Sequence, residues 1–285
     1  MTECKLKEFE IPRIVGHGCS FDENGAIASA PLSPRMIEII QAGNSFPEVD
    51  GFDPHGNWTN HYRVWTNHGN MTYQNKNTGH ISIARTTHKD CVNFQVRQII
   101  VNQDGMFQRI EAQINCERDF PGSVKDWKTQ VTCYDSAQCP MDDLSLDIAG
   151  KTYDSEVRMT VNGVEEIHSV KDPLLCQWLI LDVLQRDRKE LDTFTVLEHG
   201  LKFKKNHKLI IPTPAHKEAT VDGGVLESTI QRGTGLLPWE YWQDQAGRVL
   251  YAFSGTVMVI LDEDAPAKTD RLIEELVQRG HHYEY

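Results

Sequence analysis

The sequence predicts a mainly β protein, built on one large antiparallel sheet that is rolled into a barrel, half-barrel or sandwich, with three accessory helices. Many short segments alternate apolar and polar residues, which is typical of strands with one face in a core. Turn dipeptides such as Asn162-Gly163 separate several of these segments. Only three segments carry helix signals, so strands dominate and a rolled or layered sheet follows.

The N-terminal part of the chain is expected to be an extension, over residues 1–43, that ends in a short helix over 33–43. Ser33 can cap this helix, Pro34 suits its first position and Gly43 can end it. Residues 44–79 are rich in Asn, Gly, Pro, His and aromatics without lasting periodicity, which predicts a long loop or short strands joined by loops. No change of composition divides the rest, so 44–285 is expected to be one β domain.

The first half of this domain is expected to consist of strands. Asn162-Gly163 suits a type I′ turn and predicts a hairpin over 156–170. Apolar residues alternate with polar ones in the other segments. The strands preceding this hairpin are expected over 80–86, 91–101, 106–116 and 124–133.

A helix is expected to interrupt the strands over 173–190, with Asp172 as its cap and Pro173 at its first position. Its first half is apolar on nearly every side, so we expect it to plug or cover one face of the sheet. Strands follow over 208–212, 225–231, 239–255 and 256–264. Thr269 and Gly280 bound the last expected helix, 269–280.

Composition limits the classes of partner. The chain has 285 residues, of which 39% are apolar, and a formal net charge of −12. This acidic balance disfavours nucleic acid and anionic membranes, which bind basic surfaces. No stretch approaches the ~20 apolar residues that span a bilayer, and no signal peptide is recognisable. Seven cysteines in a chain of this length suggest reduced thiols and a cytoplasmic protein, or a secreted or periplasmic one if a leader has been removed.

The segment WTNHYRVWTNH, residues 58–68, contains the motif Trp-Thr-Asn-His twice, with the two copies seven residues apart. Seven positions place two residues on opposite faces of a strand, so a turn or bulge is required if both copies face one site. Aromatic rings beside neutral amides and imidazoles suit a sugar or another polyol. Alternatively, the Asn and Thr side chains could form hydrogen bonds with the backbone of a loop, and the tryptophans could pack between that loop and the core. The substrate-binding candidates here are Trp58, Asn60, Trp65, Asn67 and Tyr73.

Histidines supply the candidate acid–base groups, because imidazole titrates near neutral pH. The catalytic candidates are His61, His68, His80 and His88, with His55 close by in the sequence. We expect at least two of these five histidines to converge on one cleft with an aromatic wall. A divalent metal on the same histidines is an open alternative, although no pair shows the spacing of a known metal motif.

A second aromatic cluster, LPWEYWQDQAGR (237–248), could line the mouth of a barrel. Trp239 and Trp242 are its substrate-binding candidates, with Arg248 as an anion clamp; an amphipathic hairpin whose tryptophans cover the core is the alternative. Three further arginines, Arg85, Arg97 and Arg109, lie on predicted strands whose other face is apolar. They are expected to be solvated on the outer face, although a concave sheet would turn them toward a ligand.

Two functions remain open. The first is an enzyme that acts on a carbohydrate or a similar polyhydroxylated small molecule, by hydrolysis or elimination with His, Asp or Glu groups. The second is a lipocalin-like or half-barrel carrier of an apolar or amphipathic ligand. The polar loop favours the first, and the absence of GxSxG, HExxH, GxGxxG and P-loop motifs favours the second. Either function implies a small-molecule ligand, while the cofactor and the oligomeric state stay unassigned.

Overall fold

The computed structural model describes residues 44–67, 75–102, 105–212, 218–221, 224–235, 237–254 and 257–280. The strands are β1 Trp58–Asn67, β2 Asn75–Thr87, β3 Cys91–Val101, β4 Phe107–Glu117, β5 Val124–Tyr134, β6 Leu146–Tyr153, β7 Glu156–Val161, β8 Val164–Ser169, β9 Leu174–Cys176, β10 Leu191–Glu198, β11 Lys202–Ile210, β12 Glu218–Val221, β13 Gly224–Arg232, β14 Trp239–Gln243, β15 Val249–Ser254 and β16 Val257–Leu261. The helices are the 3-10 turns η1 Asp142–Leu144 and η2 Gln177–Leu179, and the α-helices α2 Ile180–Arg186 and α3 Ala265–Gly280.

The predicted mainly β class is confirmed. The described residues hold two α-helices, fewer than the three accessory helices expected, and the segment predicted as a helix over 33–43 lies outside them. Neither helix is both long enough and apolar enough to span a bilayer, within the part of the chain that the structure describes.

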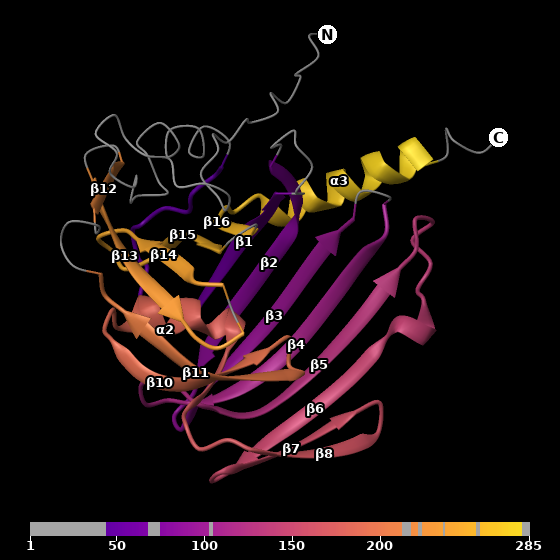
Figure 1. Ribbon diagram of the computed structural model, residues 1–285. Coiled ribbons are helices and arrows are strands. Elements are labelled where there is room, and N and C mark those ends of the chain that lie inside the picture. Colours follow the sequence, from indigo (N-terminus) through magenta and orange to yellow (C-terminus); the bar gives the residue numbers. More distant parts are fainter. Residues whose placement is uncertain are drawn as a thin grey trace, which may run out of the picture.

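All strands belong to one sheet, which curls on itself without closing (Figure 1). Its order is β8-β7-β6-β5-β4-β3-β2-β1-β16-β15-β14-β13-β11-β10-β9, with β12 paired to β13. Every pairing between the described strands is antiparallel except that of β9 with β10, so the expected antiparallel sheet is a mixed one. The Asn162-Gly163 hairpin forms as predicted, and both residues have positive φ values.

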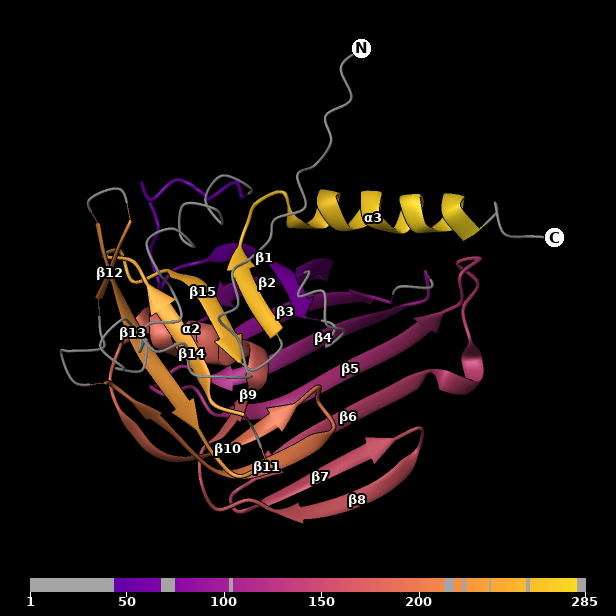
Figure 2. The same cartoon turned by 45° about the horizontal axis from the view of Figure 1, so that its top comes forward.

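Side chains, and no strand pairing among the described residues, join β8 at one end of the sheet to β11 near the other end. The rings of His168 on β8 and Phe203 on β11 lie 4.6 Å apart. Lys205 Nζ donates to the carbonyl of Ser169, and Trp127 Nε1 on β5 donates to the carbonyl of Gly200. These contacts hold the β10–β11 hairpin over one side of β5, so the sheet surrounds an interior (Figure 2).

The short helix α2 lies in this interior, against the face of the sheet that we call the inner face. Asn60 on β1 donates to Gln185 Oε1 of α2, and Gln98 on β3 accepts a hydrogen bond from Trp178 just before α2. On this face Val92, Phe94 and Val96 of β3 are all buried. The expectation that the middle helix plugs one face of the sheet agrees with this packing.

The predicted bounds of that helix, 173–190, are wrong. Leu174–Cys176 is instead the strand β9, which pairs with Thr195–Leu197 of β10, and α2 ends at Arg186. The three β9 residues are buried, and in a strand they satisfy their backbone groups at the sheet edge while filling the core. The apolar run carries no periodicity that would have distinguished the two structures.

Residues Trp58–Asn67 of the WTNH repeat form the strand β1, within the segment 44–79 for which the sequence predicts a long loop or short strands joined by loops. His68 lies outside the described residues. Trp58, Asn60, Tyr62 and Val64 face inward, and Thr59 and His61 face outward. The polar Asn60 interrupts the apolar alternation, which is why the sequence pattern concealed the strand. The tryptophans of the two copies, Trp58 and Trp65, lie on opposite faces of β1, as a spacing of seven requires in a strand. Trp65 lies on the outer face with Arg63, whose guanidinium is 4.6 Å from the centre of the Trp65 ring.

A buried ion network fixes α2 to the sheet. Asp182 Oδ1 lies 2.8 Å from Arg85 Nε, and Asp182 Oδ2 lies 2.7 Å from Arg186 Nε. Burial raises the pKa of Asp182, and the two guanidinium groups counteract this effect. Arg85 also donates to the carbonyls of His55 and Gly56. The expectation of a solvated outer-face Arg85 is therefore wrong, because its side chain points inward and is 3% exposed.

The C-terminal helix α3 begins at Ala265, four residues before the predicted Thr269, and covers one end of the outer face. Ile273 packs against Ile99, Val101 and Phe107 of the sheet. His80 on β2 stands directly opposite Ile99 and is 2% exposed. Burial, together with the smaller effect of the positive charges of Arg97 and His61, lowers the pKa of His80 from 6.5 to about 4.

Replacing Asp182 by Asn is expected to reduce the free energy of unfolding by about 3–5 kcal/mol, because two buried guanidinium groups lose their counter-charge. The matched control is Glu156→Gln, which breaks the exposed pair with Arg158 and should change stability by less than about 1 kcal/mol. Urea unfolding followed by tryptophan fluorescence measures both. Equal effects of the two substitutions would contradict a central role for this network.

Stability is expected to fall as the pH drops from about 6.5 to about 4. The lowered pKa means that the unfolded chain takes up a proton on His80 in this window before the folded chain does. The neutral His80 contributes about 3 kcal/mol to the free energy of unfolding, and this contribution is fully present above pH 6.5. His80→Gln should flatten this part of the stability profile, whereas His88→Gln, at an exposed position, should leave it unchanged. An unaltered profile in His80→Gln would exclude His80 as the source.

Candidate functional site

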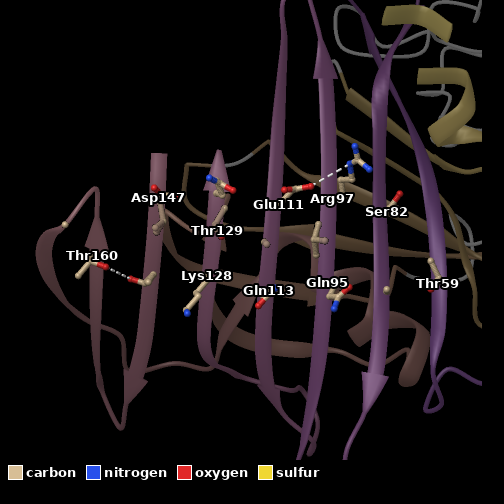
Figure 3. A pocket seen from close by; sticks show the side chains of 17 residues that line it. Thr59, Ser82, Gln95, Arg97, Glu111, Gln113, Lys128, Thr129, Asp147 and Thr160 are labelled. Atoms are coloured by element: carbon tan, nitrogen blue, oxygen red, sulfur yellow. Dashed lines mark hydrogen bonds and ion pairs between the residues drawn. The ribbon is translucent and has the colours of Figure 1, made fainter. Parts of the chain in front are cut away.

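A polar hollow of about 930 Å³ lies on the outer face of β1–β7 (Figure 3). The strands place one side chain in every two on this face, so the hollow is lined by residues far apart in the sequence. The lining residues on this face are Thr59, Ser82, Ala84, Gln95, Arg97, Glu111, Gln113, Lys128, Gln130, Asp147, Ala149 and Thr160, and Val96, Ala112, Thr129, Ile148 and Gly163 complete the lining.

The strand register aligns these side chains in two rows that cross the sheet. The first row runs, partner by partner, through His61, Ser82, Arg97, Glu111, Gln130 and Asp147. The second runs through Thr59, Ala84, Gln95, Gln113, Lys128, Ala149 and Thr160. Directly opposed residues lie within reach of one another on the same face. The two rows therefore form one continuous surface of hydroxyls, amides and charged groups.

The second row leaves space at its alanines. Ala84 lies between Thr59 and Gln95, and Ala149 lies between Lys128 and Thr160. A methyl side chain reaches less far from the sheet than the glutamines and the lysine beside it. The surface is consequently lower at Ala84 and Ala149, between longer polar neighbours that Figure 3 shows on the same face.

The charges in the hollow balance. Arg97 and Lys128 are positive, and Glu111 and Asp147 are negative. Arg97 Nε lies 4.0 Å from Glu111 Oε1, and both side chains are about half exposed, so this pair is weak. A balanced surface is notable in a chain whose net charge is −12. It favours an uncharged ligand over a strongly acidic or basic one.

His61 ends the first row and contacts Ser82. His61 Nδ1 lies 2.7 Å from Ser82 Oγ, and the carbonyl of His61 accepts a hydrogen bond from Asp262 N. Burial lowers the pKa of His61, and the charge of Glu263 opposes this shift. The imidazole is therefore neutral at neutral pH, which is the form that can accept a proton.

The structure brings together two of the histidine candidates. His61 and His80 both lie on the outer face, where His61 opposes Ser82 and His80 opposes Arg63. His55 and His88 are exposed and lie in the turns at the other end of β1 and β2. His68 lies outside the described residues. His80 is buried, so His61 is the histidine placed beside the hollow.

The tryptophan candidates divide between the two faces. Trp58 faces inward, where its ring meets Phe94 edge to face at 6.5 Å. Trp239 stacks on Tyr241 at 6.1 Å, and Tyr241 donates to Gln231 in the interior. Trp242 lies on the opposite side of β14 and is fully buried. Trp65 lies on the outer face beside Arg63. None of these four tryptophans is among the residues that line the hollow.

The remaining candidates have structural partners or are not described. Asn60 is buried and bonds Gln185 of α2. Arg248 pairs with Asp244 at 2.8 Å and donates to the carbonyls of Pro47 and Glu48, so it fixes residues 44–48 to the β14–β15 hairpin. Tyr73 lies outside the described residues, as does the side chain of Asn67.

Metal binding finds no support in the described residues. No three His, Cys, Asp or Glu side chains among them are grouped in a way that could hold a metal ion. The five described cysteines are free thiols, of which Cys116 and Cys176 are buried.

Most of the residues that line the hollow are not among the site residues predicted from the sequence. Gln95, Gln113 and Lys128 occupy the polar positions of strands whose apolar positions were recognised. Alternation identifies both faces of such a strand, but it does not give the register that aligns one strand with the next. Only the aligned rows distinguish this surface from an ordinary solvated face.

Comparisons with known proteins show a likeness of fold alone. No family model matches the chain, and no curated protein matches it in sequence. Among solved structures, it is similar to a β-barrel-like protein from Brucella abortus, of the domain of unknown function DUF1849. The superposition has a TM-score of 0.50 and covers 72% of this chain and 95% of that one, at 8% sequence identity. The chain therefore shares a β-barrel-like architecture with a protein whose domain has no known function.

Proposed function

We propose that this protein is an enzyme that binds a neutral carbohydrate, or a similar polyhydroxylated molecule, in the outer-face hollow, with His61 as the base of a hydrolysis or elimination. The observation that carries this proposal is the alignment of two polar rows across β1–β7, with the His61–Ser82 contact at the end of one.

The chemistry of the rows suits hydroxyl groups. Each hydroxyl of a sugar both donates and accepts a hydrogen bond, and a glutamine amide can do the same with its two ends. Gln95 and Gln113 oppose each other on β3 and β4, and Gln130 lies one row away on β5. The balanced charges of the hollow favour a ligand without net charge. A neutral polyol meets both requirements.

His61 and Ser82 supply a proton acceptor and a hydroxyl at the edge of this surface. A neutral His61 accepts the Ser82 proton at Nδ1 across 2.7 Å, or accepts a proton from a substrate hydroxyl that replaces Ser82 there. Arg97 lies opposite Ser82 on the neighbouring strand. Its positive charge stabilises the negative charge that develops on the hydroxyl oxygen as His61 takes up the proton. These roles agree with the imidazole acid–base chemistry expected from the sequence.

The alternative, a carrier of an apolar ligand inside the curled sheet, gains less support. The inner face of the sheet packs directly against α2, with Trp178, Leu181 and Leu184 buried. An apolar ligand would compete with these side chains for the interior.

The double substitution Gln95→Ala and Gln113→Ala is expected to weaken ligand binding about tenfold or more, because each lost amide contributes roughly 1 kcal/mol. A glycan array first identifies a bound sugar, and isothermal titration calorimetry then measures its Kd. The control is Gln278→Ala on the exposed surface of α3, which should bind normally. Equal affinity in the double variant and the control would place the ligand elsewhere.

His61→Gln is expected to lower turnover of the bound sugar by about 100-fold or more while changing its Kd little, because the substitution removes the base and keeps a polar group. Release of reducing ends measures hydrolysis, and formation of an unsaturated product measures elimination. Full activity in this variant would reject His61 as the base. Binding without turnover in the wild-type protein would reduce the proposal to a carbohydrate-binding function.

A further inference from the structure

The outer-face hollow is long as well as polar. Its second row, which runs from Thr59 to Thr160, crosses the strands from β1 to β7. Neighbouring strands lie about 4.8 Å apart, so this row extends over roughly 29 Å. The volume of the hollow, about 930 Å³, is at the upper end of the range for small-molecule sites, about 300–1,000 Å³. A single sugar ring is much shorter than this row and leaves most of it unused.

Two borders run beside the rows. On one side α3 lies across β3 and β4, where Ile273 packs against Ile99 and Phe107 (Figure 2). On the other side, Asn115 Nδ2 donates to Asp126 Oδ1 at 2.5 Å, so these two opposed residues satisfy each other. The free polar surface is therefore longer across the strands than along them, and an elongated ligand fits it with its axis across the strands.

The polar ends of the second row are available to a ligand. The side chains of Gln95, Gln113 and Lys128 are exposed, and they make no hydrogen bond or ion pair within the described part of the chain. The same holds for the side chains of Gln130 and Asp147 in the first row. Each of these groups can donate to a hydroxyl or accept from one. Successive strands from β3 to β6 thus offer one free polar group after another.

We propose that the ligand of the hollow is a linear, β-1,4-linked oligosaccharide of about five sugar units that lies across the strands, and not a single sugar. This inference rests on the carbohydrate function proposed above and names the length and orientation of the ligand. In such a chain, successive sugars follow one another at nearly the spacing of strands in a sheet, and the chain can twist with the sheet. Gln95, Gln113 and Lys128 bond the hydroxyls of successive sugars, while the low positions at Ala84 and Ala149 hold the bodies of the rings.

The two ends of the bound chain have different roles. The His61–Ser82 contact lies at one end of the rows, on β1 and β2. Sugars bound at Lys128 and Ala149, on β5 and β6, are remote from this contact and contribute affinity without taking part in the chemistry. The length of the ligand, and not only the type of sugar, therefore determines its affinity.

Isothermal titration calorimetry of the full chain tests the dependence on length. The probes are β-1,4-linked disaccharides and hexasaccharides of glucose, xylose and mannose, so the two members of each series differ only in length. In at least one series, the hexasaccharide is expected to bind about tenfold or more tightly than the disaccharide, because its additional hydroxyls bond the groups on β5 and β6.

A smaller gain in every series that binds would overturn the inference and leave the proposed function standing, since a long chain gains a few-fold merely by binding a short site in several registers. Failure of all the probes to bind would also overturn the inference. A glycan array on which nothing binds would reject the proposed function as well.

A blocking substitution tests the position of the chain. Ala149→Trp places a ring over the second row near its β7 end, and it is expected to weaken hexasaccharide binding about tenfold or more while the disaccharide, which has other positions along the rows, binds as before. The control is Leu237→Trp, at an exposed position outside the lining, which should bind both probes normally. Hexasaccharide affinity equal to that of the control would contradict the extended placement. Thermal melting shows whether Ala149→Trp is folded, and if it is not, the comparison of lengths on the wild-type protein decides.

Discussion

The ion network of Asp182, Arg85 and Arg186 holds the structure together at the point where α2 meets the sheet. A helix of seven residues has little stability of its own, so its position depends on the contacts it makes. Burying three charges is costly unless their partners are correctly placed, which penalises other positions of α2. Through Arg85 the network also holds the backbone at His55 and Gly56, and through Arg186 it holds the carbonyl of Pro121.

The position of α2 determines which surfaces remain for a ligand. Because α2 fills the interior, the inner faces of β1–β5 serve the core, and their outer faces carry the polar rows. The hollow on these outer faces is broad, and its ion pair between Arg97 and Glu111 is weak.

The sequence contained the fold class and several strands, because alternation and turn residues are local signals. The β3–β4 pair and the Asn162-Gly163 hairpin agree with that pattern. The same pattern did not identify β1, because the inward-facing Asn60 interrupts the apolar alternation. It also did not identify β9, because three apolar residues suit a helix or a strand equally well. The sequence predicts Arg85 on the solvated outer face of the sheet, because a charged residue on a strand is normally solvated. Its partner Asp182 is 97 positions away in the sequence. No local rule detects such a pair.

The candidate sites were less predictable for the same reason. His61 was recognised by its residue type, but its partner Ser82 became visible only through the pairing of β1 with β2. The rows of the hollow likewise depend on contacts between distant segments. Chemistry of this kind arises from register: a one-residue slip of β3 against β2 would move Arg97 to the inner face and bring Gln98 out. The buried residues that fix the register, Phe94 and Val96 among them, thereby determine the polar surface on the other side of the same strands.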